Sequence, residues 1–111
     1  MFQYTFKQKQ IWTDEAPRPV MEVKRPFAML SDLGNGNLQT LRGATAAIRN
    51  IEKVMKGEKK KYSFGGSDAC LVEVEPATCR VAYDFGEKET TVPTKALLEL
   101  LQDWKAFLSK K

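Results

Sequence analysis

The chain has 111 residues, of which 42% are hydrophobic and 29% charged, and its formal net charge is +4. These values are typical of one globular domain, residues 1–111, whose core forms without disulfides or structural metals. The sequence has no histidine, so it lacks the commonest general base and zinc nitrogen ligand, which argues against most enzymes. No apolar run resembles a membrane span or a signal peptide, so we expect a cytoplasmic protein.

The N-terminal residues predict extended structure. Phe2, Tyr4 and Phe6 alternate with polar residues, which is typical of a half-buried strand. Two prolines within residues 13–19 cannot donate backbone hydrogen bonds, so we expect a break there. A second, short extended segment over residues 20–24 follows it.

A loop and a helix are predicted next. The Leu-Gly-Asn-Gly-Asn run over residues 33–37 tolerates positive φ and predicts a mobile loop. It is not a Walker phosphate loop, because no Lys-Ser or Lys-Thr pair follows it. Apolar residues then recur at helical spacing over residues 38–56, and Gly57 stands where a C-terminal cap glycine would.

The second half predicts a β-meander. Tyr62 and Phe64 alternate before a turn over residues 65–68, and strands follow over residues 69–75 and 78–85. Pro76 excludes the two-residue hairpin turns with positive φ and favours a four-residue loop, Glu75 to Thr78. That loop fixes a register in which one face carries the pairs Val74–Cys79, Val72–Val81 and Cys70–Tyr83. The other face carries Leu71, Glu73 and Glu75 against Thr78, Arg80 and Ala82, so Glu73 faces Arg80.

The same register keeps the two cysteines apart. Cys70 and Cys79 are separated by about four residues along the strands, roughly 13 Å at 3.3 Å per residue. Because a disulfide needs a much shorter distance, we expect both to be reduced core thiols.

The chain ends in a strand and a helix. A short strand over residues 90–92 leads through Pro93 into a helix whose broad apolar stripe comprises Leu97, Leu98, Leu101, Trp104, Ala106 or Phe107, and Leu108. We expect Trp104 to close this helix onto the sheet. The predicted fold class is therefore α+β, an antiparallel β-meander of four to six strands with two helices packed on one face.

Charge divides the chain in two. Residues 1–61 hold 12 Lys and Arg against 6 Asp and Glu, whereas residues 62–111 hold 6 against 8. The densest basic stretch runs from Lys53 to Lys61 at the end of the predicted helix. Cations there complement the helix dipole and keep the loop that follows the helix in solvent. We favour this interpretation over a nucleic-acid patch because the run has no Arg or interleaved aromatic residue.

One resemblance suggests a function. The plan of an N-terminal aromatic strand, a mid-chain helix, the meander with Tyr62–Gly66 and Ala69–Glu75, and the ending Thr91–Phe107 resembles bacterial immunity proteins of contact-dependent growth inhibition and related polymorphic toxin systems. The resemblance covers about the last fifty residues better than the first fifty. It implies a protein that is not an enzyme, needs no cofactor, and neutralises a cognate toxin domain, often a nuclease, by binding it.

An acidic set is the candidate toxin-binding site. Its members lie on the predicted solvent face and the far turn of the meander, where they could mimic phosphates to a basic nuclease cleft: Glu73, Glu75, Asp84, Glu87 and Glu89. The alternative for each carboxylate is a solvated sheet face, and the basic half of the chain could equally contact an acidic toxin surface.

A small basic nucleic-acid-binding module is the alternative function. Lys7, Lys9, Lys24, Arg25 and the stretch from Lys53 to Lys61 would contact phosphates, with an aromatic residue such as Tyr62 for stacking. A net charge of only +4 and an acidic second half make nucleic acid the less favoured partner. An enzyme ranks third, because no paired catalytic constellation is present in the sequence.

Overall fold

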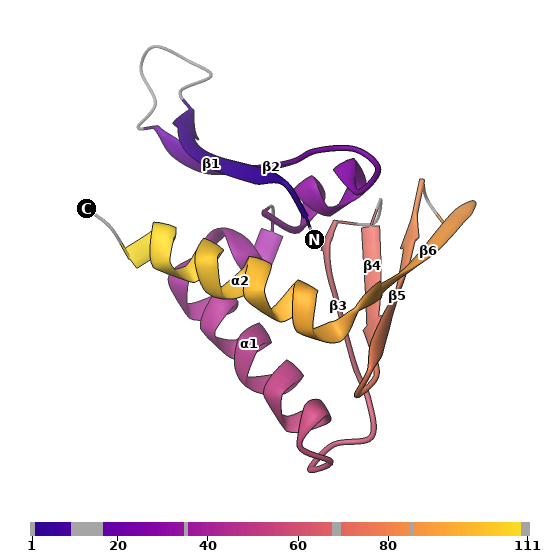
Figure 1. Ribbon diagram of the computed structural model, residues 1–111. Coiled ribbons are helices and arrows are strands. Elements are labelled where there is room, and N and C mark those ends of the chain that lie inside the picture. Colours follow the sequence, from indigo (N-terminus) through magenta and orange to yellow (C-terminus); the bar gives the residue numbers. More distant parts are fainter. Residues whose placement is uncertain (1, 10–16, 35, 68–69, 85, 110–111) are drawn as a thin grey trace.

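The computed structural model describes residues 2–9, 17–34, 36–67, 70–84 and 86–109 (Figure 1). The fold is α+β, with two antiparallel sheets and two α-helices. The elements in chain order are β1 (Tyr4–Lys9), β2 (Arg18–Val23), the 3-10 helices η1 (Ala28–Gly34) and η2 (Gly36–Gln39), α1 (Leu41–Met55), β3 (Tyr62–Ser67), β4 (Cys70–Val74), β5 (Thr78–Tyr83), β6 (Lys88–Pro93) and α2 (Thr94–Ser109).

The four-stranded sheet is a meander in the order β3-β4-β5-β6. Its central hairpin has the predicted register, with Val74 opposite Cys79, Val72 opposite Val81 and Cys70 opposite Tyr83. Both helices lie on one side of this sheet (Figure 1), and their buried residues belong to the same core as the strand valines. Within the described residues, no helix covers the opposite face of the sheet.

The N-terminal half departs from the prediction. The predicted break over residues 13–19 is wrong at its end, because Arg18 and Pro19 pair with β1 in a separate two-stranded sheet. Both strands of a two-stranded sheet are edges, where a proline needs no ladder hydrogen bond on its open side. The rest of that segment up to residue 16 lies outside the described residues.

The predicted mobile loop over residues 33–37 is also wrong. Leu33 is fully buried at the end of η1, and η2 begins at Gly36, with Asn35 outside the described residues. Leu38, expected to begin the helix, lies in η2, and α1 starts at Leu41 after the N-cap Thr40, whose side chain accepts a hydrogen bond from the Gly43 N–H at 3.0 Å.

The other end of α1 follows the prediction. Gly57 has φ +83°, the left-handed conformation that terminates many helices. Its N–H donates to the Val54 carbonyl at 3.1 Å, which satisfies one carbonyl of the last turn.

Residues 65–67 of the predicted turn extend a strand instead, and residue 68 lies outside the described residues. β3 continues to Ser67, and its pairing with β4 shifts between Gly65 and Ser67. Gly65 permits this close approach, because a Cβ there would lie 2.6 Å from the Cys70 carbonyl oxygen and 2.9 Å from a Leu71 methyl carbon.

The core lies between the meander and the two helices. Trp104 is fully buried, as predicted, and so is Leu100, which the predicted stripe omitted; Ala106 is exposed. The β1–β2 sheet joins this core through Phe6, whose ring centroid is 5.2 Å from that of Trp104. No helix in the described part of the chain is long and apolar enough to cross a membrane.

Candidate functional site

Two members of the predicted acidic set meet on the helix-free face of the meander. Glu73 on β4 lies directly across from Arg80 on β5, and Glu89 lies on β6, the strand on the other side of β5. The Arg80 guanidinium is 2.8 Å from the Glu73 carboxylate and 3.5 Å from the Glu89 carboxylate. The basic side chain between them neutralises part of their charge.

The other three members lie in turns at opposite ends of the sheet. Glu75 precedes the β4–β5 turn, whereas Asp84 and Glu87 belong to the β5–β6 turn. The Asp84 carboxylate is 3.9 Å from the Lys88 ammonium. The structure therefore gathers the predicted set into one acid–base–acid group and two separate turns.

An exposed leucine lies on the same helix-free face. Leu71 is 55% exposed, the largest exposed fraction among the large hydrophobic residues of the described chain. Its cross-strand neighbours are Gly65 and Ala82, whose side chains are too small to cover it. Sequence reasoning placed Leu71 on this face but assigned it no role.

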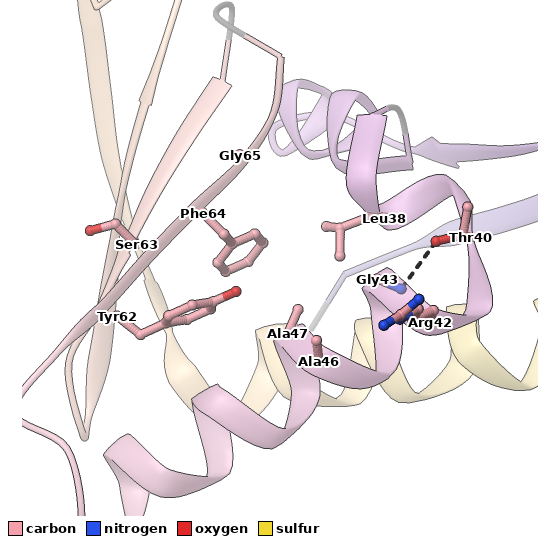
Figure 2. Close-up of a pocket in the computed structure, with 10 residues that line it drawn as sticks. All are labelled: Leu38, Thr40, Arg42, Gly43, Ala46, Ala47, Tyr62, Ser63, Phe64 and Gly65. Atoms are coloured by element: carbon pink, nitrogen blue, oxygen red, sulfur yellow. Dashed lines mark hydrogen bonds between the residues drawn. The ribbon is translucent and has the colours of Figure 1, made fainter.

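A groove between β3 and α1 is the first of two hollows in the described residues, and sequence reasoning missed it. Its volume is about 460 Å³, and Figure 2 shows Phe64 and Leu38 facing each other across it, with Tyr62 pointing toward α1. The side chain of Ser63 points away, so this residue lines the groove with its backbone. The lining residues are Leu38, Thr40, Arg42, Gly43, Ala46, Ala47, Tyr62, Ser63, Phe64 and Gly65.

One end of this groove is organised around Tyr62. Burial raises the pKa of the Tyr62 hydroxyl, and a hydrogen bond with the Asn50 side chain opposes the rise. The Lys59 ammonium donates to the side-chain amide oxygen (Oδ1) of Asn50 at 2.8 Å and lies 5.3 Å from the centroid of the Tyr62 ring. These three side chains join α1 to β3 and place a cation at the end of the groove.

The predicted basic stretch includes Lys59, the cation at this end. Residues 41–61 hold seven Lys and Arg against two Glu. Lys53, Lys56 and Lys59 to Lys61 are exposed. Arg42, which lines the groove, is exposed too, and no carboxylate of the described residues forms an ion pair with it.

A second hollow, of about 480 Å³, lies between β1 and α2. The Tyr4 hydroxyl there donates a hydrogen bond to the Asp103 carboxylate. Burial, this hydrogen bond and the negative charges of Asp103 and Glu99 together raise the pKa of Tyr4 to about 12. The pair holds the N-terminal sheet on the last helix.

The cysteines lie in the core, as expected. Cys70 and Cys79 are both buried and form no disulfide. The Cys79 sulfur is 3.3 Å from the Thr94 hydroxyl, which donates to the Glu75 carbonyl oxygen at 2.6 Å. Burial raises the pKa of Cys79, which disfavours the reactive thiolate. The described residues contain no group of three or more His, Cys, Asp or Glu that could hold a metal ion.

Comparison with known proteins adds no relative. No protein family, no curated protein and no solved structure matches the chain.

Proposed function

We propose that this chain is an immunity protein, which neutralises a cognate toxin domain, a nuclease, by forming a stable complex with it on the helix-free face of the meander. The arrangement of Leu71 on that face, near the Glu73–Arg80–Glu89 group, is the observation that supports the proposal. An exposed apolar side chain near a group of ion-paired charges is typical of a protein interface.

The two kinds of residue have different tasks in such a complex. Leu71 buries apolar surface against the toxin and slows dissociation. Asp84 and Glu87 extend from the β5–β6 turn, where their charges attract a basic cleft and raise the association rate. Arg80 limits the local excess of negative charge.

Co-expression with the toxin domain encoded beside this chain tests the proposal, with bacterial growth and complex formation as readouts. The wild-type chain restores growth. The Glu87→Lys/Glu89→Lys variant slows association severalfold and lowers protection, and Leu71→Asp speeds dissociation. The matched control is Glu58→Lys/Glu99→Lys, which changes net charge by the same amount away from this face.

Two outcomes would remove the proposal. One is growth arrest in the presence of the wild-type chain. The other is tight RNA or DNA binding at about 0.15 M salt with a steep salt dependence, which would favour the nucleic-acid module instead. Full protection by the double reversal and by Leu71→Asp would exclude the helix-free face while leaving the immunity function in place.

A further inference from the structure

The strand pairing determines which backbone N–H and C=O groups of β3 point away from the sheet. The Glu75 N–H donates to the Thr78 carbonyl at 3.0 Å, which makes these two residues a hydrogen-bonded pair at the hairpin end. Because such pairs alternate along an antiparallel ladder, Glu73 and Leu71 also direct their backbone groups toward β5, and Val74 and Val72 direct theirs toward β3.

The alternation then fixes the orientation of β3. Tyr62 and Phe64 pair with Val74 and Val72 and direct their backbone groups inward. Ser63 and Gly65 therefore direct their N–H and C=O groups away from the sheet. Both residues line the groove, so this open edge faces the concave surface beside α1 (Figure 2).

The groove has apolar positions that match an added strand. Successive side chains of a strand point to opposite faces, so a strand placed beside β3 would direct every second side chain toward α1. There it would meet Phe64, Leu38 and the alanines of α1. The intervening side chains would lie on the helix-free face, beside Ser63 and Gly65.

Charge selects the occupant. Arg42 lines the groove and Lys59 lies at its Tyr62 end, and both belong to the basic segment over residues 41–61. A second copy of this chain would bring the same cations to the same edge, and the like charges would repel. An acidic strand would instead find complementary charge at both the groove and its rim.

From this geometry we infer that the β3 edge binds an extended acidic segment of a partner protein, which joins the meander as a fifth strand along Ser63 and Gly65 and places its charges near Arg42 and Lys59. Strand addition of this kind takes affinity from main-chain hydrogen bonds and specificity from alternate side chains. The inference rests on the proposed function only for the identity of the protein that carries the segment.

Nuclear magnetic resonance titration of the whole isotope-labelled chain tests this site. The probe is a capped peptide as long as β3, six residues, in which valine alternates with glutamate. The matched peptide replaces each glutamate with lysine. The acidic peptide shifts the amide signals of Ser63, Gly65 and Arg42 and slows hydrogen exchange at Ser63 and Gly65, and its affinity falls as salt rises. The basic peptide causes neither these signal shifts nor the slower hydrogen exchange.

Two pairs of variants separate the hydrogen bonds from the charge. Ser63→Pro removes an outward-facing N–H at a sheet edge, where proline is tolerated. This variant lowers the affinity for the acidic peptide roughly tenfold. Its control is Thr91→Pro, at an outward-facing position of the opposite edge strand, β6. Arg42→Glu also weakens binding roughly tenfold, whereas Arg49→Glu, exposed on α1 outside the groove, leaves it within about twofold.

Several results would overturn the inference. Equal binding of the acidic and basic peptides, signal shifts confined to residues outside the groove, or unchanged affinity in both Ser63→Pro and Arg42→Glu would each exclude it. Concentration-dependent dimerisation that Ser63→Pro abolishes would assign the edge to a second copy. Protection from the toxin is measured separately, so the acidic peptide could bind while immunity fails, or the reverse.

Discussion

The indole N–H of Trp104 donates a hydrogen bond to the Leu38 carbonyl oxygen at 2.6 Å. This bond joins the last helix, α2, to η2, the turn that precedes α1, across 66 residues of sequence. Both residues are buried, so neither the donor nor the acceptor has water as a substitute partner. The same indole packs against Phe6 and Phe107 and so connects the N-terminal sheet to the core.

Replacement of Trp104 separates the packing of its ring from the hydrogen bond. Trp104→Ala creates a cavity and lowers the free energy of unfolding by about 3–5 kcal/mol. Trp104→Phe fills most of the space but leaves the Leu38 carbonyl unsatisfied, at a cost of about 1–3 kcal/mol. Urea denaturation measures both values. A loss below about 1 kcal/mol for Trp104→Ala would contradict a core position.

Gly65 has no side chain, yet we expect its replacement to destabilise the fold. In Gly65→Ala the new Cβ meets the Cys70 carbonyl oxygen at 2.6 Å, and backbone atoms must move to relieve the overlap. We expect the free energy of unfolding to fall by about 1–3 kcal/mol. Ser63→Ala, on the same strand with an exposed side chain, should stay within about 0.5 kcal/mol of wild type. Equal stability of the two variants would mean that β3 relaxes freely at its bulge.

The sequence predicted the meander well because strand parity leaves little choice. A slip of one residue in the β4–β5 hairpin would bury Glu73 and expose Val72, so only one register suits the composition. Glycine was a poorer guide. Gly34 and Gly36 suggested a loop, yet Gly34 ends one 3-10 helix, which contains buried Leu33, and Gly36 begins the next, because tertiary packing overrides local turn preference.

The candidate sites also differ in how well the sequence predicted them. Alternation placed Glu73 and Arg80 opposite each other, and the structure confirms that pairing. The β3–α1 groove had no such signal, since its walls come from residues 38–47 and 62–65, whose distance in space depends on how the helix docks.

Thiol labelling tests the positions of the two cysteines. Cys70 and Cys79 are fully buried, and burial raises the pKa of Cys79, so a thiol reagent reacts slowly with the native chain and rapidly in urea. Mass spectrometry of the labelled protein counts two modified thiols after unfolding. Rapid native labelling of Cys79 would contradict its packing against Thr94, and a disulfide between the two would contradict the hairpin register.

The Tyr4–Asp103 pair makes stability fall at high pH. Tyr4 binds its proton more tightly in the folded chain, where its pKa is about 12, than at its ordinary value of 10.0, because burial and the Asp103 and Glu99 charges disfavour the phenolate. The unfolded state therefore releases this proton first. The stability contributed by Tyr4 is fully present below about pH 10 and is lost as pH rises toward 12.

Tyrosinate absorbance and urea unfolding, measured between pH 9 and about 12, test this linkage. In Tyr4→Phe the tyrosine signal that titrates near pH 12 disappears, and the free energy of unfolding falls less steeply with pH than in wild type. Asp103→Asn is the matched variant: it keeps an acceptor for the hydroxyl but removes a negative charge, so Tyr4 titrates at lower pH. Identical pH profiles for wild type and Tyr4→Phe would show that Tyr4 ionises as freely in the folded chain as in the unfolded one.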